Sequence, residues 1–569
     1  MTDTTKLYAE LNRARAELTG PGGQFEIVEQ EVLGHQLRCF KNAPPSVREF
    51  WLSTAMFGER DYIVYEGERL TYAEAHRQAG ALAAWLFEQG VAPGDRVAIA
   101  MRNYPEWLTA YWACVSCGIA VVGMNAWWTG EEMEYALKDS APKAMICDKE
   151  RLAAYRAVQD PAVPILLVGV RLPDYAADVT PWADVVAGAG TMPQVTVDPD
   201  MDACIFYTSG TTGFPKGAQL THRGCIANLM NMLFSGASSA LAMERAKGEL
   251  PPEVPPVPVV LLTTPLFHVT ANNCGAYLTS AAGGTIVLMY RWDAGAALKL
   301  IAAEKISSMS GVPVMSRELI NHPDFATTDT STLTGLSGGG AQVPPDLVLK
   351  IDEKVATARP TTGYGMTETC GIITSVSGDF FVARPDTAGP YMPSFDARVV
   401  DDDGNDVPPG TVGELWVKGS PVIKGYINRP DATAQTITDG WLHTGDVARI
   451  DSDKFVYIVD RKKDLVIRGG ENVSCTEVEA CVYRHPAVAE CCVFGVPDER
   501  LGEEIGVAVV VKPGSTCDET ELQKHCLEHM SKHKVPRYVW FEGEALPRNA
   551  SGKFLRRELR DRLSAGVAG

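Results

Sequence analysis

The chain has 569 residues, too many for one hydrophobic core, so several subdomains are expected. Hydrophobic residues make up 46% of the chain and charged residues 22%, which are ordinary values for a soluble globular protein. Lys and Arg number 52 against 71 Asp and Glu, a net charge of −19, and a field of that sign disfavours nucleic acid and anionic lipid as partners.

The cysteines and the chain ends bear on the cellular compartment. Fourteen cysteines occur without regular spacing, which favours reduced thiols over a disulfide framework. Residues 1–18 are polar and helix-like without an apolar signal core, and the final AGVAG is not a peroxisomal address of the Ser-Lys-Leu type. No uninterrupted apolar stretch reaches the roughly 18 residues of a membrane span. We therefore expect a cytoplasmic protein without a membrane span. The sequence leaves the oligomeric state open, and a homodimer is one of the alternatives.

Short apolar strands alternate with amphipathic helices over residues 61–150. Alternation of this kind predicts an α/β layered domain. Strands are expected at Arg96–Met101 and Ile119–Gly123, and helices at Glu106–Gly118 and Thr129–Lys138. Similar strand patterns return further along the chain, at Asp202–Tyr207, Val259–Thr263 and Gly284–Met289.

The pattern changes in the second half of the chain. From Ala397 it predicts short strands and turns, and after Asp460 a compact α+β unit. In that unit we expect helices at Cys475–Tyr483 and Asp518–His533 and strands near 491–495 and 506–512. We therefore predict a large N-terminal domain of layered α/β subdomains with a β-rich segment (1–460) and a small, mobile C-terminal α+β domain (461–569).

The segment Tyr207–Gly217, YTSGTTGFPKG, combines hydroxyls, three glycines and Lys216. Glycines let backbone N–H groups face an anion, and hydroxyls and a lysine add donors and a positive charge. The loop is not a Walker A motif, because Pro215 and not glycine precedes the lysine. On composition alone, a solvated Gly/Thr loop between strands is an equally good interpretation.

Four further motifs could serve a nucleotide. Thr362–Thr369, TGYGMTET, offers an aromatic ring and a carboxylate of the kind Mg²⁺ prefers. Gly338–Ala341, GGGA, would let a flat ligand approach the backbone closely. Trp441–Asp446, WLHTGD, together with Asp460–Arg461 suits a ribose diol. Leu546–Leu559 places a lysine on a flexible turn before a basic helix.

In this order and spacing the five motifs resemble the adenylate-forming acyl-CoA synthetases, a family that also includes firefly luciferase and the adenylation domains of peptide synthetases. The resemblance covers the chain from about residue 45 onward. It implies an enzyme that uses ATP, with Mg²⁺, to convert a carboxylic acid into an acyl-adenylate and pyrophosphate. The acyl group is then transferred to coenzyme A, and AMP is released.

The resemblance also implies which residues bind the nucleotide. Lys216 would hold the β- and γ-phosphates, Thr367 would touch the α-phosphate, and Glu368 would hold Mg²⁺. The remaining contacts to the phosphates, adenine and ribose would come from Thr208, Ser209, Gly210, Thr211, Thr212, Gly339, Gly340, Ala341, Gly363, Tyr364, Asp446 and Arg461.

Two half-reactions are implied, with different residues in the site. Lys553 would lie between the substrate carboxylate and the α-phosphate and offset their repulsion. His268 would lie at the mouth of the acyl pocket, the alternative being a buried core histidine. For thioester formation the small domain would rotate about Lys463 and bring the Arg468-Gly469-Gly470 turn into the site, leaving room for pantetheine.

The chain departs from the family pattern at two places. Asp460 stands where many members have glycine, although several plant-type ligases carry aspartate there. The glycine run beginning at Gly338 is one residue longer than expected, so the adenine contacts could be shifted by one position. Residues before about 45 match no motif.

The acid is less well determined than the reaction. Small or neutral residues match the family's acyl pocket, without a charge for a second ionised group, so an amino acid is disfavoured. A medium- or long-chain fatty acid is the leading candidate and an aryl or cyclic acid the alternative. An acyl-AMP ligase that skips CoA and a non-catalytic binding protein are further alternatives. The matched residues are Val269, Thr270, Asn273, Gly338, Met366, Thr369 and Gly371.

Three motifs suggest other chemistry and are set aside. Gly335–Gly339 fits the G-x-S-x-G nucleophile elbow but overlaps the glycine loop. His525–His529 fits the H-x-x-E-H zinc pattern, yet the apolar face of that helix places both histidines on its solvated flank. Cys114 and Cys117 lie in an apolar helix without a partner pair, so packed thiols are expected.

Overall fold

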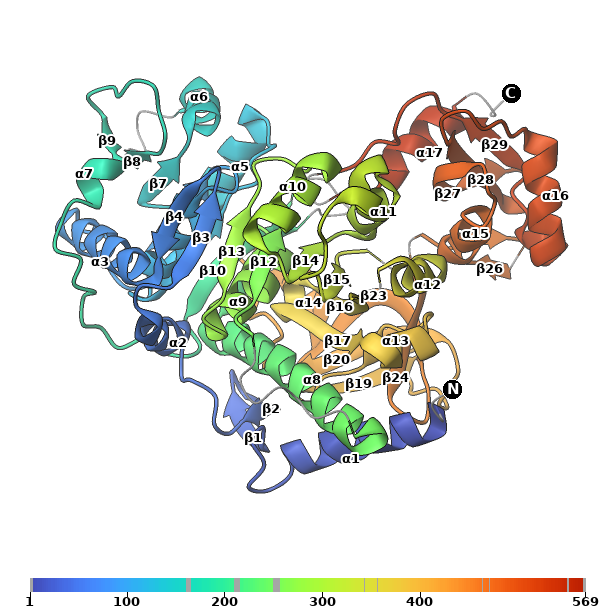
Figure 1. The fold of residues 1–569 in the computed structure, drawn as a ribbon, viewed down its shortest axis with the longest axis horizontal. Helices are drawn as coiled ribbons and strands as arrows, with labels where there is room; N and C mark the ends of the chain where they lie inside the picture. Colours follow the sequence, from blue (N-terminus) through green and yellow to red (C-terminus); the bar gives the residue numbers. More distant parts are fainter. Residues whose placement is uncertain are drawn as a thin grey trace.

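The computed structural model describes residues 4–159, 165–208, 215–248, 256–341, 343–355, 357–462, 464–469, 471–549 and 552–565. Five β-sheets organise this part of the chain (Figure 1). A hairpin, two eight-stranded sheets and a β-rich sheet form the large domain, and a five-stranded sheet forms the small unit drawn in red. This is the α/β architecture of several subdomains that the sequence predicted.

The N-terminal residues, which match no motif, brace the large domain. The predicted helix there lies along α8 (Figure 1), and the Tyr8 hydroxyl donates to the carbonyl of Phe380 at 2.7 Å. The Arg38 Nε donates to the carbonyl of Pro393 at 2.8 Å, which fixes the hairpin. The elements are α1 (Thr4–Thr19), β1 (Ile27–Val32), β2 (His35–Phe40) and α8 (His222–Lys247).

The first large sheet has the spatial order β21-β11-β10-β6-β5-β7-β8-β9 and confirms the predicted alternation, with ends that differ by a few residues. Its strands are β5 (Arg96–Ala100), β6 (Ala120–Gly123), β7 (Ala144–Cys147), β8 (Leu166–Gly169), β9 (Val179–Pro181), β10 (Asp202–Thr208), β11 (Lys216–Thr221) and β21 (Gly425–Tyr426). The accompanying helices are α2 (Val47–Ser53), α3 (Tyr72–Glu88), α4 (Pro105–Val115), α5 (Gly130–Ser140), α6 (Lys149–Val158) and α7 (Trp182–Val185).

The second large sheet has the order β17-β16-β15-β14-β12-β13-β3-β4. Its strands are β3 (Asp61–Tyr65), β4 (Glu68–Thr71), β12 (Val259–Leu262), β13 (Thr285–Leu288), β14 (Ser308–Gly311), β15 (Gly335–Gly338), β16 (Arg359–Met366) and β17 (Gly371–Ser377). The accompanying helices are α9 (Tyr277–Ala281), α10 (Ala294–Glu304), α11 (Pro313–Asn321), α12 (Pro345–Lys354) and α13 (Gly378–Ala383).

The main core lies between these two sheets. Helix α4 is apolar on nearly all sides, as expected of a helix enclosed on every face. The ring of Trp112 in α4 stacks on Trp51 of α2 with centroids 4.8 Å apart. Among the described helices, α8 is long and apolar enough to cross a membrane, but 56% of its apolar window is buried in the protein, which is typical of a core helix.

The β-rich sheet and the small unit follow in the chain. The sheet contains β18 (Gly389–Pro390), β19 (Phe395–Val400), β20 (Gly413–Gly419), β22 (Ile437–Thr438), β23 (Trp441–Ile450) and β24 (Phe455–Arg461), with α14 (Pro430–Thr436) beside it. The small unit contains β25 (Val466–Arg468), β26 (Glu471–Val473), β27 (Val488–Asp498), β28 (Gly502–Val511), β29 (Tyr538–Phe541), α15 (Cys475–Val482), α16 (Glu519–His529) and α17 (Arg556–Ser564).

The predicted second helix of the small unit was too long. Helix α16 ends at His529, because Met530 is extended and a separate 3-10 turn covers Lys532–Lys534. Pro536 accounts for the end of the 3-10 turn, because the residue before a proline, here Val535, is biased away from helical conformation. The rest of the small unit has the predicted strands and helices.

Candidate functional site

The predicted motifs meet at one end of the two large sheets. Strands β15 and β16 run parallel, and the glycine loop 338–341 and the turn Thr367–Thr369 continue from their carboxyl ends. This is the edge at which α/β sheets bind ligands. The β-rich sheet brings Asp446 and Arg461 to the same place, and the small unit brings Lys553.

Lys216 and Glu368 are linked through a tyrosine that the sequence analysis missed. Lys216 faces Thr208 across the β10–β11 pair, and its Nζ lies 5.0 Å from the ring centroid of Tyr426. The Tyr426 hydroxyl donates to Oε1 of the buried Glu368 at 2.8 Å. Burial, and then the Glu368 charge, raise the pKa of Tyr426, so the hydroxyl remains a donor. Tyr426 reaches this place because β21 pairs with β11, and no local sequence motif indicates that pairing.

Tyr364, Asp446 and Arg461 form a second connected group. The Tyr364 hydroxyl donates to Oδ2 of Asp446 at 2.6 Å, and the Arg461 Nε lies 3.1 Å from Oδ1. Asp446 and Arg461 are direct partners in the β23–β24 register. Burial raises the pKa of the Asp446 carboxyl, and Arg461, Tyr364 and Lys553 act in the opposite direction. The predicted ribose-binding pair is therefore brought together beside the predicted stacking tyrosine, with Gly363 next to it in β16.

The glycine loop turns sharply where a nucleotide base was expected. The Gly339 N–H donates to the carbonyl of Gly311 at 2.9 Å. Gly340 has φ of 75°, a conformation that favours glycine. A methyl group built on Gly340 would lie 3.9 Å from Cε of Lys553, and Ala341 at the end of the loop is exposed.

Lys553 reaches the site from a tight turn of the small unit. Its N–H donates to Oδ1 of Asn549 at 2.9 Å, and the Asn549 N–H donates back to the Lys553 carbonyl at 2.8 Å. A methyl group built on Gly552 would lie 2.8 Å from Cγ2 of Val312, so the turn rests directly on the large domain. The Lys553 charge lowers the pKa of His268 as well as acting on Asp446.

His268 is half-buried beside this lysine. Its Nδ1 is buried without a hydrogen-bond partner among the described residues. Burial first, and then Lys553, lower the pKa of His268 to about 4, so the ring is neutral near pH 7. A neutral imidazole with an unpartnered nitrogen fits a site wall better than a satisfied core histidine.

A group of buried, hydrogen-bonded polar residues, called the polar floor below, lies among the residues matched to the acyl pocket. Asn228 of α8, which sequence analysis missed, donates to the carbonyl of Asn273 at 3.1 Å and accepts from the Ile372 N–H at 2.9 Å. A methyl group built on Gly371 would lie 2.3 Å from Oδ1 of Asn228. The buried Thr369 hydroxyl lies 2.9 Å from the carbonyl of Gly371. A fully buried asparagine in an apolar helix is the signal that could have indicated Asn228.

Some predicted residues are not part of this assembly. Arg468 pairs with the buried Glu504 at 2.7 Å, and the Gly469 N–H donates to the carbonyl of Leu501, so both are engaged within the small unit. Ser209, Gly210, Thr211, Thr212, Lys463 and Gly470 lie outside the described residues.

The three motifs that were set aside differ in outcome. Ser337 lies within strand β15 and not on a strand-to-helix turn, which contradicts a nucleophile elbow. Cys114 and Cys117 are buried thiols, as predicted. His529 is exposed, but His525 is half-buried with Nε2 3.1 Å from the carbonyl of Cys481, so its predicted place on a solvated flank was wrong. Helix α16 packs on α15 along that edge.

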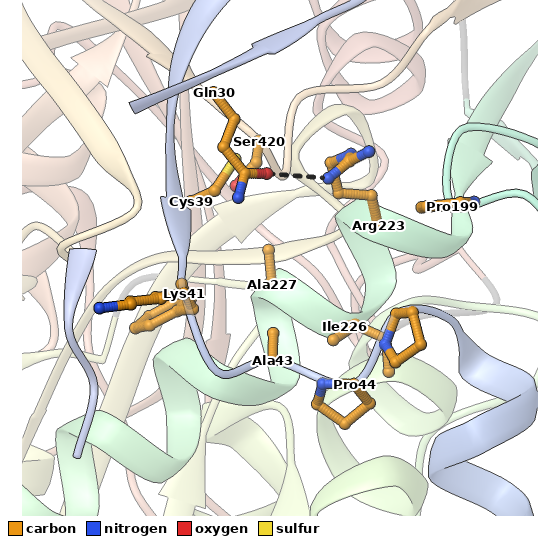
Figure 2. A pocket seen from close by; sticks show the side chains of 12 residues that line it. Gln30, Cys39, Lys41, Ala43, Pro44, Pro199, Arg223, Ile226, Ala227 and Ser420 are labelled. Atoms are coloured by element: carbon orange, nitrogen blue, oxygen red, sulfur yellow. Dashed lines mark hydrogen bonds between the residues drawn. The ribbon is translucent and has the colours of Figure 1, made fainter. Parts of the chain in front are cut away.

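A cavity of about 190 Å³ lies between the β1–β2 hairpin and the start of α8, and its lining side chains are drawn in Figure 2. Arg223 projects into it, but its guanidinium is paired with Asp200 at 2.7 Å and contacts Gln30 at 3.4 Å. Lys41 is paired with Glu26 at 2.9 Å. The cations here already have protein partners, and the described lining residues include none of the predicted site residues.

Comparison with known families gives two matches along the chain. A model described as AMP-binding enzyme matches residues 50–427, and one described as AMP-binding enzyme C-terminal domain matches residues 477–553. The first match alone covers well over half of the chain.

Individual proteins are similar over nearly the whole length. A feruloyl-CoA synthase of Amycolatopsis sp is 38% identical over 507 residues, which cover 87% of this chain and 94% of the relative. A long-chain-fatty-acid–CoA ligase of Escherichia coli O6:H1 is 33% identical over 547 residues, with 91% and 94% covered. The o-succinylbenzoate CoA synthetase of Bacillus subtilis, solved with its acyl-adenylate intermediate, is 29% identical with a TM-score of 0.74, covering 91% of this chain and 99% of that one.

Proposed function

The chain belongs to the AMP-binding enzyme family and is an AMP-forming acyl-CoA synthetase, and from this premise we propose that its acid substrate is a compact aromatic carboxylic acid. The observation that carries the proposal is the polar floor formed by Asn228, Asn273 and Thr369. A long alkyl chain extending deeper would have to break these buried hydrogen bonds, and each buried group left unpaired costs about 1–3 kcal/mol. The similarity to a feruloyl-CoA synthase supports the same class.

In the first half-reaction the acid carboxylate attacks the α-phosphate of ATP. The bond to pyrophosphate breaks, and acyl-AMP forms. Lys216 and the loop after Thr208 hold the outer phosphates, Thr367 contacts the α-phosphate, and Lys553 offsets the repulsion between the carboxylate and the phosphate. Adenine lies between the Gly339–Ala341 loop and Tyr364, with the ribose on Asp446 and Arg461. Charge stabilisation and positioning suffice, because ATP itself supplies the activation.

Glu368 fits a magnesium ion. Its carboxylate is buried, one oxygen is oriented by the Tyr426 hydroxyl, and Mg²⁺ is commonly held by one or two carboxylates together with phosphate oxygens. When bound there, Mg²⁺ would neutralise phosphate charge. The role of Tyr426 is to hold Glu368 in one orientation, in the way that outer hydrogen bonds orient metal ligands.

For the second half-reaction we propose that the small domain, residues 461–569, rotates about Lys463 relative to residues 1–460. The contact of Gly552 with Val312 and the approach of Lys553 to Gly340 correspond to the pose for adenylation. Arg468 and Gly469 face their own domain in this pose, and rotation would bring their turn to the acyl-AMP to guide CoA. The thiol then attacks the acyl carbon, and AMP leaves.

An acid-panel assay tests the substrate class. Hydroxycinnamates, benzoates and fatty acids of about six to sixteen carbons are compared by pyrophosphate release and by mass spectrometry of the thioester. We expect the best aromatic acid to exceed the best fatty acid in kcat/KM by about tenfold or more, the scale at which pockets discriminate. A graded preference for fatty acids would overturn the acid class while the enzyme class stands.

A matched pair of variants tests the polar floor itself. Asn228→Ala should widen acceptance toward longer acids, because it removes the group that fills the pocket end. Asn231→Ala is the control, since Asn231 is equally buried on α8 but pairs with Ser394. Equal effects of the two substitutions on the acid profile would contradict the assigned floor.

A further inference from the structure

A cluster of metal-ligating side chains lies in the small domain, apart from all the residues proposed to act in the reaction. His485 comes from the turn after α15, Cys517 from the segment before α16 and Glu521 from the first turn of α16. Figure 1 places both helices on the small domain. The potential ligand atoms of the three side chains all lie within 4.8 Å of one another.

The spacing of these atoms suits tetrahedral coordination. The His485 Nε2 lies 3.6 Å from Oε1 of Glu521 and 4.0 Å from Sγ of Cys517. With zinc bonds of about 2.0–2.3 Å to N, O and S, the edges of a tetrahedron are about 3.4–3.6 Å long. The 3.6 Å separation lies at the upper end of that range, and the 4.0 Å separation exceeds it by about 0.4 Å, so small side-chain movements would close the site.

The three side chains are positioned by different parts of the fold. His485 is only 5% exposed, and its ring packs edge-on against His525 with centroids 5.1 Å apart. Cys517 is half-buried, and the Glu521 side chain is 56% exposed. The Glu521 N–H is held by Oδ1 of Asp518 at 2.9 Å, which fixes the first turn of α16. A buried imidazole with an accessible thiol and carboxylate leaves a fourth position open toward solvent.

We propose that His485, Cys517 and Glu521 form a binding site for one divalent transition-metal ion, with Zn²⁺ as the best match. Nitrogen, sulfur and carboxylate oxygen together are a zinc ligand set, whereas Mg²⁺ and Ca²⁺ prefer oxygen alone. The bound ion joins the turn after α15 to α16, so it stabilises the small domain and takes no part in acyl transfer.

Metal binding at His485 requires a proton to move and a hydrogen bond to break. The Ala487 N–H donates to Nδ1 of His485 at 3.3 Å, so in the metal-free protein Nε2 carries the proton. Coordination through Nε2 moves that proton, gives up this long hydrogen bond and deprotonates Cys517. Binding therefore releases protons, and its affinity increases with pH.

The test uses the full-length protein after treatment with a chelator. Titration with Co²⁺ should produce thiolate-to-cobalt charge-transfer absorption that saturates at one ion per chain, and Zn²⁺ should displace the cobalt. Calorimetry with Zn²⁺ should give the same stoichiometry. Cys517→Ala should abolish the absorption, and Glu521→Gln should weaken binding about tenfold or more.

Two control substitutions separate this site from others. Cys274 is the other half-buried cysteine among the fourteen, so Cys274→Ala should leave the cobalt absorption unchanged. Glu528→Gln changes an exposed carboxylate on the same helix, within the H-x-x-E-H motif, and should also leave it unchanged. Circular dichroism checks that each variant is folded. Saturable binding that survives Cys517→Ala in a folded protein, or no saturable binding in the wild type, would overturn the proposal.

Discussion

A single substitution at Lys553 removes the positive charge that lies between the carboxylate and the α-phosphate in the proposed mechanism. Lys553→Ala should slow acyl-AMP formation by roughly a hundred- to a thousandfold, because loss of one electrostatic stabiliser costs about 2.7–4 kcal/mol. Thioester formation from supplied acyl-AMP should remain, since a different turn then occupies the site. Single-turnover assays of the two half-reactions measure both effects.

The control for this substitution is Arg557→Ala, which removes a charge four residues further on with a side chain that is 76% exposed. It should leave both half-reactions nearly unchanged. If Lys553→Ala impaired both half-reactions equally, a single static site would be the better description.

Tyr426 offers a second test at the residue scale. Tyr426→Phe removes the hydroxyl that donates to Glu368 and leaves the ring near Lys216 in place. We expect the Mg²⁺ concentration for half-maximal pyrophosphate exchange to rise about tenfold, as for other outer-shell partners of a metal ligand. The KM for the acid should change little. An unchanged Mg²⁺ dependence with a raised acid KM would place Tyr426 in the acyl pocket instead.

At the scale of the elements, Asp460 connects strand β24 to the start of helix α15 through hydrogen bonds. This buried carboxylate accepts from the Arg461 N–H at 2.8 Å, the Ser474 hydroxyl at 3.0 Å and the Thr476 N–H at 3.2 Å. The residue that departs from the common family pattern thus ties the last strand of the β-rich sheet to the start of the small domain. Its three hydrogen bonds give a physical reason for aspartate at this position.

Asp460→Ala should loosen this connection. It leaves the half-buried Thr476 N–H without its partner, and a hydrogen bond to a charged group contributes about 1.5–3 kcal/mol. We expect faster limited proteolysis near residue 463 and a lower urea midpoint for the small domain. Asp464→Ala is the comparison, because Asp464 is less buried and pairs with Arg556 at 3.3 Å. Proteolysis no faster than in wild type would contradict the anchoring role.

Elements with strong local patterns could be predicted from the sequence, and contacts between distant elements could not. The alternation near 96–138 determines strands and helices directly, because each buried face repeats at its own period. The residues of each motif were likewise identifiable, because the five motifs together, in their order and spacing, resemble one family, although the composition of a single loop was not decisive. Tyr426 and Asn228 were missed because sheet order and helix packing bring them to the site. The half-buried place of His525 was missed for the same reason. The end of α16 was missed because the backbone becomes extended at Met530, ahead of any glycine or proline that would mark a helix end in the sequence.

At the scale of the whole molecule, the two domains meet through the turn that carries Lys553. A Cβ built on Gly552 lies 3.7 Å from Cβ of Val312, close to the mean separation of about 3.8 Å in disulfides. The side chain of Arg317 in α11 also lies over the ring of Tyr483 at 5.2 Å, across the same junction. The adenylation pose therefore has a pair of positions at which it can be locked covalently.

The double variant Val312→Cys, Gly552→Cys should form this disulfide under mild oxidation. Cysteine at 552 must adopt φ near 81°, which is unfavourable for a side chain, so partial formation is expected. The oxidised fraction should still make acyl-AMP and release pyrophosphate, because Lys553 stays in place, but it should not form the thioester. Reduction should restore thioester formation. Each single variant and the oxidised wild type control for the native thiols and for the strain at 552. If the oxidised double variant completed both half-reactions at the rate of the reduced one, the domains would not need to rotate, and CoA would reach the acyl group in the pose described above.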